Sequence, residues 1–305
     1  FMLHGIIDIG SNTIRMAIYF IEGQQIEMLM KKKHIVGLAS YLKDGVMQPA
    51  GIDAAVAVLK EFKDFLQTFQ IDSAVAFTTA ALRNAKNSKA AVNEIERRTG
   101  INIRVITGDE EATFDFIGAT HDIKADSGLL IDIGGGSTEI VAYKARKITQ
   151  KISLPLGSLA FHTKYVKGVL PTSEECQQMY KAAGNTINAA NDFAGISEAS
   201  IAGIGGTFKG ANALYNEMFQ APLANNCMQA DKLAEIIETF KLDKGITQAM
   251  TIMMMRTVPD RMHTVIPGLI IADVLAKHFQ SHIITYSDSG VREGYIYSEI
   301  VKTND

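Results

Sequence analysis

A short motif occurs twice in the chain and limits the folds that are open to it. The first copy begins Gly5-Ile-Ile-Asp8-Ile-Gly10, and the second begins Gly128-Leu-Leu-Ile-Asp132-Ile-Gly134. In each copy an apolar run ends in Asp-Ile-Gly, a polar turn follows, and a second apolar run begins. Asp132 lies 124 positions after Asp8, which is about the length of one domain. We therefore expect a duplicated unit that starts with a strand, a tight turn and a second strand.

The remaining sequence fits two α/β domains. A chain of 305 residues is too long for one compact core. Apolar residues at helical spacing predict a helix over 50–69, and the run 74–80 predicts a buried strand. The same alternation in the second half is typical of mainly parallel sheets covered by helices. We predict domains over 1–125 and 126–305, and the last helix could pack back on the first domain.

Composition and charge exclude several classes of protein. The formal charge of -3 lacks the basic excess of a protein that coats duplex nucleic acid, although local cations can still hold a small anion. No apolar run reaches the ~20 residues that a membrane span needs, and no signal peptide is evident. Cys176 and Cys227 lack metal spacing, so we expect reduced core residues. These features predict a soluble, cytoplasmic protein.

The turns that follow the two Asp-Ile-Gly motifs have the composition of anion-binding loops. Glycine tolerates the backbone angles that let several N–H groups converge on one anion. A hairpin connection without a ligand would also explain either turn alone. Because the turn occurs twice, we predict phosphate binding by Gly10, Ser11, Asn12 and Thr13 and by Gly134, Gly135, Gly136 and Ser137.

A third glycine pair, Gly205-Gly206, follows the predicted strand 200–204. We expect Thr207 to cap the helix that follows, so that the helix N-terminus faces the anion. Gly206 and Thr207 therefore join the predicted phosphate-binding set. The spacing of a P-loop is absent from all three segments.

Several acids accompany these loops. Asp8 and Asp132 end their strands, and Glu139 lies two positions after Ser137, so the three are candidate ligands for Mg²⁺. A further run, Asp109-Glu110-Glu111, opens a predicted helix. Acids favour a helix N-terminus through the helix dipole, and the same acids could supply a catalytic base. The spacing alone leaves both interpretations open.

With these motifs in order, the chain resembles the exopolyphosphatase/guanosine pentaphosphate phosphohydrolase (Ppx/GppA) family, and in particular its short form without a C-terminal helical extension. The resemblance spans nearly the whole chain. The segments that carry it are Asp8–Arg15, Ala76–Ala85, Glu110–Ala112, Ile131–Glu139, Gly205–Thr207, Val265–Gly268 and Ser287–Gly294. It implies two ribonuclease-H-like domains of the actin/sugar kinase superfamily with an inter-domain cleft.

The resemblance also implies roles for individual residues. Glu111 matches the family's general base for the attacking water, and Arg83 matches an arginine that holds the terminal phosphate. Asp132 and Glu139 match acids that position Mg²⁺ and the water. The implied activity is that of an exopolyphosphatase, a pppGpp 5'-phosphohydrolase, or both, and the short form favours shorter polyphosphates. Polyphosphate or guanosine penta- or tetraphosphate is then the partner, rather than duplex nucleic acid or a membrane, and a homodimer is compatible with the sequence.

Two other functions stay open at this point. One is an ATPase or kinase of the same superfamily, and the other is a non-catalytic sensor of alarmones or phosphate. Lys31-Lys32-Lys33 could contact a polyanion, although such a run is more typical of a solvated strand edge. Lys209 and Arg292 lie beside matched motifs and are further candidates for a basic groove.

Overall fold

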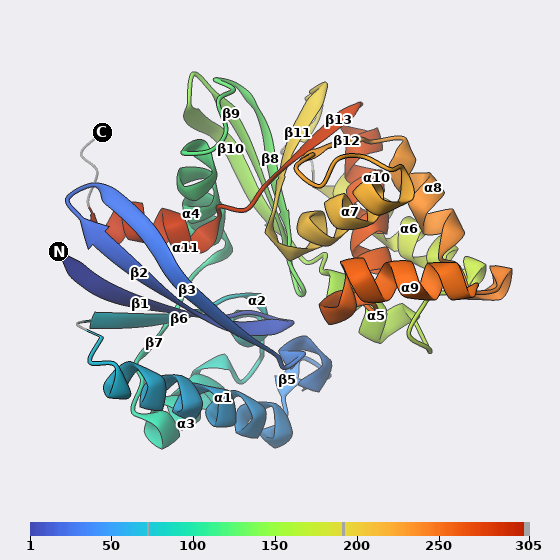
Figure 1. Cartoon of the computed structure of the whole chain (residues 1–305). Helices are drawn as coiled ribbons and strands as arrows, with labels where there is room; N and C mark the ends of the chain where they lie inside the picture. Colours follow the sequence, from blue (N-terminus) through green and yellow to red (C-terminus); the bar gives the residue numbers. More distant parts are fainter. Residues whose placement is uncertain (72, 191–192, 302–305) are drawn as a thin grey trace. The chain divides into compact units, whose positions relative to one another are not determined.

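The computed structural model describes residues 1–71, 73–190 and 193–301 (Figure 1). The chain forms two compact units. The first contains Phe1–Glu111 together with the segment from Tyr295, and the second is Ala112–Gly294. Each unit has its own sheet and its own apolar core.

The limits of these units differ from the predicted domains. The chain enters the second unit inside helix α4 (Gly108–Thr120) and leaves it inside helix α11 (Val291–Tyr295). A π-helical turn, η5 (Ile296–Ile300), follows in the first unit. Both changes of unit therefore fall within helices rather than in glycine- or proline-rich linkers, which is why composition did not mark them.

A five-stranded sheet organises the first unit, in the order β3-β2-β1-β6-β7. The first three strands form an antiparallel meander, and the other two run parallel to β1. The strands are β1 (Met2–Ile9), β2 (Thr13–Glu22), β3 (Gln25–Ile35), β6 (Ser73–Thr78) and β7 (Ile103–Val105). The smaller elements are η1 (Leu38–Tyr41), β4 (Leu42–Lys43), β5 (Val46–Met47) and α2 (Ala80–Arg83).

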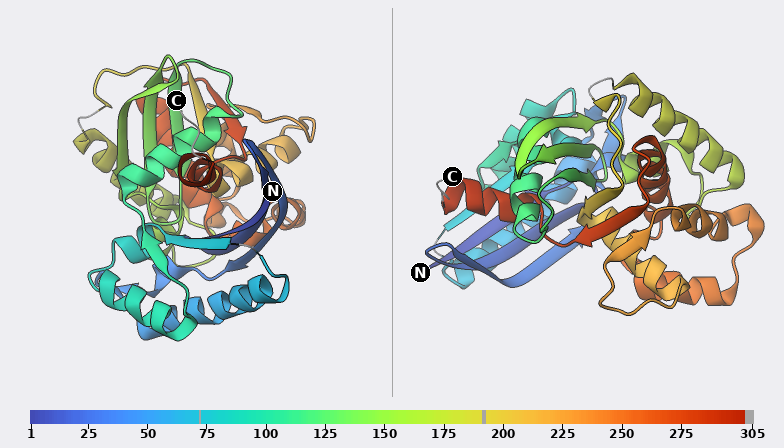
Figure 2. Two further views of the ribbon diagram at one scale, coloured as in Figure 1. Left: turned by 90° about the vertical axis from the view of Figure 1, so that its left-hand side faces the viewer. Right: turned by 90° about the horizontal axis from the view of Figure 1, so that it is seen from above.

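Two helices cover one face of this sheet, α1 (Pro49–Thr68) and α3 (Ser88–Thr99) (Figure 2). The helix predicted over 50–69 is confirmed, and its proline stands at the start, where no backbone donor is lost. Ile7, Ile9 and Met16 pack in the same core cluster as residues of both helices. Because side chains alternate along a strand, Asp8 lies on the opposite face of the sheet.

A six-stranded sheet organises the second unit, in the order β10-β9-β8-β11-β13-β12. Strands β8, β9 and β10 again form an antiparallel meander, and β11 and β13 run parallel to β8. The strands are β8 (Gly128–Ile133), β9 (Thr138–Lys144), β10 (Lys147–Leu154), β11 (Ser200–Ile204), β12 (Cys227–Gln229) and β13 (Ile283–Ser287).

The two faces of the second sheet are covered by different helices. Leu129 and Ile131 share a core cluster with residues of α7 and α10, whereas Leu130 packs with Ala112 and Phe116 of α4. The remaining helices of this unit are α5 (Ser158–Tyr165), α6 (Ser173–Ala189), α7 (Gly205–Met218), α8 (Lys232–Thr239), η3 (Leu242–Lys244), α9 (Gln248–Thr257), η4 (Pro259–Arg261) and α10 (Val265–His278).

The predicted duplication is present in the strand order. Five strands follow one another in the same arrangement in both sheets, and β12 is an addition at the edge of the second. The hairpins also share one register, because Ile9 pairs with Ile14 and Ile133 pairs with Thr138, with four residues between the partners in each case. Each unit is thus ribonuclease-H-like, as the resemblance implied.

The expectation for the cysteines is only half right. Cys176 is buried, and burial raises the pKa of its thiol to about 11. Cys227 is exposed, because the edge strand β12 alternates and turns Met228, not Cys227, toward the core. Over the residues with described positions, we found no helix with both the length and the hydropathy required to cross a membrane.

Candidate functional site

The first glycine loop, Gly10–Thr13, is closed by a hydrogen bond from Gly10 N to Thr13 O at 3.1 Å. Its carbonyl groups are occupied by the segment that follows β3. The Ala39 N–H donates to Ser11 O at 2.9 Å, and the N–H groups of Val36 and Gly37 donate to Asn12 O at 3.0 and 2.8 Å. Within the described part of the chain, no acceptor takes the N–H groups of Ser11 and Asn12.

The second loop, Gly134–Ser137, repeats this pattern. Gly134 N donates to Ser137 O at 2.9 Å. The first residues of α5 bind its carbonyls, since Ser158 N donates to Gly134 O at 2.9 Å and Leu159 N to Gly135 O at 3.0 Å. Among the described residues, the N–H groups of Gly135 and Gly136 again lack an acceptor. In each loop the carbonyl groups are bonded to the following segment, and the N–H groups that remain are of the kind that can bind an anion.

Close backbone packing fixes the second loop. A Cβ atom on Gly157 would lie 2.3 Å from Gly135 O and 2.4 Å from Gly136 N, so only glycine allows this approach. Gly268 allows a second close approach, because a Cβ atom there would lie 2.5 Å from Cγ2 of Thr207. The glycines of two separate segments therefore support the loop.

Beside each loop, charged side chains lie opposite one another on neighbouring strands. In the first unit they are on the face of the sheet away from α1 and α3, and in the second unit on the face away from α7 and α10. In the second unit Asp132 pairs directly with Glu139 across β8 and β9. Glu139 is 1% exposed, and its Oε1 accepts a hydrogen bond from Ser153 Oγ at 2.7 Å. In the first unit Asp8 pairs with Arg15, with 4.0 Å between Asp8 Oδ2 and Arg15 Nη1. The equivalent aspartates thus face partners of opposite charge.

The cross-strand partners distinguish Asp8, which faces an arginine, from Asp132 and Glu139, which face each other. Carboxylates directly opposite one another are unfavourable unless a cation lies between or beside them. Asp132 and Glu139 offer hard oxygen atoms of the kind that Mg²⁺ prefers, and Mg²⁺ commonly takes one or two carboxylates with phosphate and water. Over the described residues, no cluster of three or more His, Cys, Asp or Glu side chains is placed to hold an ion. The residues present fit a site of the two-carboxylate type.

The N-terminus of α7 adjoins Asp132. Gly205, at φ 79°, starts this helix directly after β11, and a Cβ atom there would lie 2.1 Å from Asp132 Oδ1. The capping role expected of Thr207 is wrong, because the helix begins two residues earlier and the Thr207 hydroxyl donates to Ile133 O at 2.7 Å. Gly205 and Gly206 occupy the first turn, whose N–H groups can bind an anion.

Arg261 was missed by sequence reasoning. Its guanidinium packs on the first turn of α7, where a Cβ atom on Gly206 would lie 2.4 Å from Arg261 Nη1. The residue lies in η4, 55 positions beyond Gly206, and no motif contains it. The nearest matched segment, Val265–Gly268, begins four positions later and does not indicate this contact.

In the first unit, the structure brings Arg83 and Glu111 together. Arg83 Nη1 donates to Glu111 Oε2 at 2.5 Å, and their side chains are only 14% and 10% exposed. The neighbouring Glu110 instead accepts from Thr107 N at 2.8 Å, and its own N–H donates to Thr107 Oγ1 at 3.1 Å. This is a capping box. The helix-end explanation therefore suffices for Glu110, and Glu111 has a different environment.

The two basic candidates beside the matched motifs lie in different environments. Lys209 Nζ lies 3.2 Å from Asp288 Oδ1, and Arg292 is 7% exposed. Phe208, next to Lys209, is also in the core, where its ring packs on Gly203.

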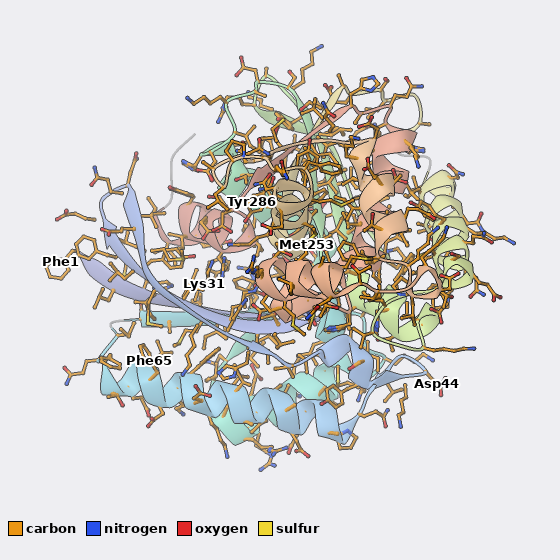
Figure 3. All side chains as sticks on the ribbon, turned by 45° about the vertical axis from the view of Figure 1, so that its right-hand side comes forward. Phe1, Lys31, Asp44, Phe65, Met253 and Tyr286 are labelled. Carbon is orange, nitrogen blue, oxygen red and sulfur yellow. The ribbon has the colours of Figure 1, made fainter. Side chains whose placement is uncertain are left out.

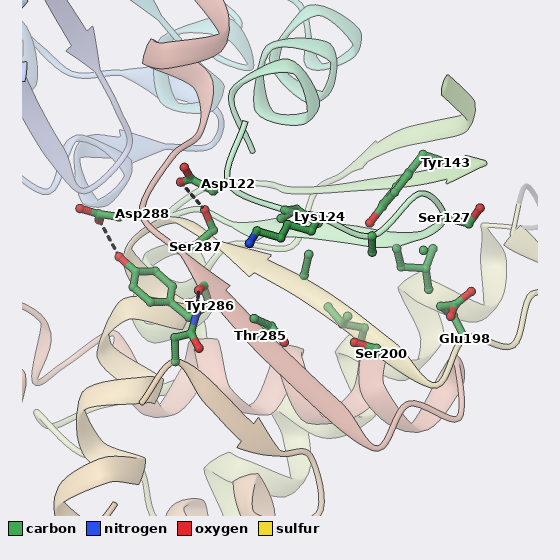
Figure 4. A pocket seen from close by; sticks show the side chains of 17 residues that line it. Asp122, Lys124, Ser127, Tyr143, Glu198, Ser200, Thr285, Tyr286, Ser287 and Asp288 are labelled. Atoms are coloured by element: carbon green, nitrogen blue, oxygen red, sulfur yellow. Dashed lines mark hydrogen bonds between the residues drawn. The ribbon is translucent and has the colours of Figure 1, made fainter. Parts of the chain in front are cut away.

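The second unit also contains a cavity of about 550 Å³ (Figure 4). It lies near the start of β8 and β11 and is lined in part by Lys124, Tyr143 and Glu198. Two of its acids are held by hydroxyl groups, since Tyr286 donates to Asp288 at 2.6 Å and Ser287 donates to Asp122 at 3.1 Å. None of the predicted site residues lines it.

The sequence matches the model of the Ppx/GppA phosphatase family over residues 17–303. It is 28% identical to a putative exopolyphosphatase from Haemophilus influenzae over 96% of this chain and 90% of that protein. It is also 28% identical to a guanosine-5'-triphosphate,3'-diphosphate pyrophosphatase from Pseudoalteromonas atlantica, over 62% of this chain and 38% of the relative.

The structure is similar to a crystal structure of the Ppx/GppA family member from Aquifex aeolicus. The TM-score is 0.75 at 25% identity, and the match covers 100% of this chain and 99% of the other. The family model, the relative from Haemophilus influenzae and the fold agree over nearly all of the chain. The chain therefore belongs to the Ppx/GppA phosphatase family, and it is accordingly a hydrolase.

Proposed function

We propose that the protein hydrolyses the terminal phosphoric anhydride bond of polyphosphate or of guanosine pentaphosphate and releases orthophosphate. The observation that carries this proposal is the pair of glycine loops with one hydrogen-bond pattern. Each loop offers N–H groups of the kind that bind phosphoryl oxygens. The relatives from Haemophilus influenzae and Pseudoalteromonas atlantica are named for substrates of this kind.

In this proposal Asp132 and Glu139 hold Mg²⁺. The support is their direct pairing across β8 and β9 and the almost complete burial of Glu139. When bound, the ion would neutralise charge on phosphoryl oxygens. Asp8 has Arg15 as its cross-strand partner, which already balances its charge. Asp8 is therefore the weakest of the three candidate ligands.

The reaction itself is assigned to Glu111 and Arg83. Arg83 would bind a terminal phosphoryl oxygen and so exchange part of its contact with Glu111 for the substrate. Glu111 would then orient a water molecule and take its proton as the new P–O bond forms and the anhydride P–O bond breaks. The shortened chain is the leaving group and keeps the electron pair of that bond, and the attacked phosphoryl group is released as orthophosphate.

The test compares orthophosphate release from polyphosphate, pppGpp and ATP with and without Mg²⁺. Glu111→Gln should lower turnover by about 100-fold or more, which is typical for loss of a general base, and should retain substrate binding. Glu110→Gln is the matched control, because glutamine also completes a capping box. Its turnover should stay within about twofold of wild type, a margin well below the general-base effect.

Each other outcome has a definite meaning. Turnover of ATP alone would identify an ATPase or kinase and refute the proposal. Binding of pppGpp or polyphosphate without any turnover by the wild-type protein would identify a sensor. Unchanged turnover in Glu111→Gln would remove Glu111 from the base role.

A further inference from the structure

The cavity of the second unit lies against small side chains on neighbouring strands. Ser200 and Ala202 share one face of β11, because they are two positions apart, and Ala202 pairs with Thr285 of β13. Gly128, at the start of β8, adds a residue without a side chain. Larger side chains at these positions would fill the space. The volume of about 550 Å³ lies within the range of small-molecule sites, roughly 300–1,000 Å³.

Tyr143 of β9 brings a buried hydroxyl group to this cavity. The residue is 5% exposed, and its ring packs against Phe116 of α4 with 5.2 Å between the ring centroids. A Cβ atom on Gly128 would lie 3.1 Å from the Tyr143 hydroxyl, so glycine keeps the space beside it open. None of the described residues forms a hydrogen bond with this hydroxyl, although a buried tyrosine usually finds a partner. The hydroxyl end of the ring points into the cavity (Figure 4) and offers a donor there.

Two ionic side chains that line the cavity form no ion pair or hydrogen bond with the described part of the chain. They are Lys124, which follows α4, and Glu198, which precedes β11. Burial raises the pKa of Tyr143, and the negative charge of Glu198 raises it further, so the hydroxyl keeps its proton at neutral pH. One cation, one anion and one neutral donor are therefore available to a ligand.

The other two acids of the cavity are bonded within the protein. Asp122 accepts from the Ser287 hydroxyl at 3.1 Å, and Asp288 accepts from the hydroxyl of Tyr286, which is labelled in Figure 3, at 2.6 Å. Together with Glu198 they give the described lining three acids against one base. This excess of negative charge disfavours phosphate-bearing and other strongly anionic ligands.

We propose that this cavity binds a small zwitterion with an apolar body, either a free apolar amino acid or a short apolar peptide. The carboxylate of the ligand accepts hydrogen bonds from Lys124 and Tyr143, and its ammonium pairs with Glu198. A ligand with only one of these charges leaves the other ionic group of the cavity without a counter-charge. The apolar body contacts Ile123 and Ile201, which also line the cavity. This site does not depend on the hydrolysis proposed above.

Calorimetric titration of the full chain, without any substrate of hydrolysis, compares leucine and leucyl-leucine with their capped forms. At least one of the two zwitterions should bind with a Kd of about 1 mM or tighter. N-acetylation removes the ammonium and amidation removes the carboxylate, so each cap should weaken binding by about 2- to 5-fold or more. The zwitterion that binds more tightly shows whether the ligand is an amino acid or a peptide. Binding of neither zwitterion, or equal binding of the capped forms, would overturn the proposal.

Variants then locate the binding. Tyr143→Phe removes only the hydroxyl and should weaken binding about 2- to 10-fold, the worth of one hydrogen bond. Lys124→Ala and Glu198→Gln should each weaken it about 2- to 5-fold. Lys144→Ala is the matched control and should bind as the wild type does, because Lys144 is exposed next to Tyr143 and does not line the cavity.

The stability of Tyr143→Phe separates a binding role of the hydroxyl from a structural one. Since no described residue bonds the hydroxyl, the variant should keep the wild-type Tm in the absence of ligand. A clearly lower Tm would assign the hydroxyl to the fold and refute its role as a ligand contact. Wild-type affinity in Tyr143→Phe, or an equal loss of affinity in Lys144→Ala, would refute the site as well.

Discussion

Gly157→Ala is a direct test of how the second glycine loop is held. Gly157 has φ -135° and ψ 142°, an extended conformation that alanine adopts without strain. The added methyl group would lie 2.3 Å from Gly135 O and 2.4 Å from Gly136 Cα. Real contacts of this type are at least 3.0 Å long, so the loop has to move away from the start of α5. The substitution therefore acts by steric overlap with the backbone of Gly135 and Gly136.

The size of the effect follows from that overlap. Forcing one extra methyl group into a closely packed site costs about 1–3 kcal/mol, and alanine is a poorer N-cap than glycine by about 0.5 kcal/mol. A loss of about 2–3 kcal/mol corresponds to a Tm lower by roughly 5–10 °C. Displacing phosphate-binding N–H groups by a large fraction of an ångström should also reduce kcat/KM by about 10-fold or more.

Thermal unfolding and orthophosphate release measure both effects. Gly184→Ala is the control, because a Cβ atom there has no heavy atom within 4 Å and the position lies inside helix α6. That variant should be more stable by about 0.5–1 kcal/mol through helix propensity, with unchanged kinetics. A Gly157→Ala protein with the wild-type Tm and kcat/KM would refute the account of a loop supported from behind.

Two further predictions concern charge. Hydrogen bonding from the Thr107 backbone holds the pKa of Glu110 below its usual value of 4.5, so its stabilisation is complete above pH 4.5 and is lost as the pH falls through the lower, folded-state pKa. Acid unfolding of Glu110→Gln should therefore show a shallower loss of stability below pH 4.5, and an unaltered acid limb would contradict this. Asp132→Asn should raise the Mg²⁺ concentration for half-maximal turnover by about 10-fold or more, since one of the two proposed carboxylate ligands is lost. Asp8→Asn should raise it less, and the reverse order would place the ion at the first loop.

Local patterns in the sequence predicted the elements well. The strands before both Asp-Ile-Gly turns and the helix predicted over 50–69 follow from the spacing of apolar residues. The capping box of Thr172 and Glu175 likewise joins residues only three positions apart. These features depend on residues that are close together in the chain, so one sequence is enough to find them.

Contacts between distant segments were out of reach. The meeting of Arg83 with Glu111 spans 28 positions and was implied only by the family resemblance. The packing of Arg261 on Gly206 had no signal at all. The Thr207 prediction failed for a related reason, because the Ile133 carbonyl that binds its hydroxyl comes from another strand. Rules for helix ends predict hydrogen bonds between residues that are close in the sequence, whereas the Thr207 hydroxyl bonds a residue 74 positions away.

The shared hydrogen-bond pattern of the two loops has a consequence for the origin of the chain. In each copy, the segment that follows the third strand donates to the carbonyls of the hairpin turn, by different residues and with a different helix type. An arrangement that survives such divergence belongs to the unit that was duplicated. The two copies differ at the position across the hairpin from the shared aspartate, which is Arg15 in the first copy and Glu139 in the second. The backbone of the turn is thus common to both halves, and the charge beside it is not.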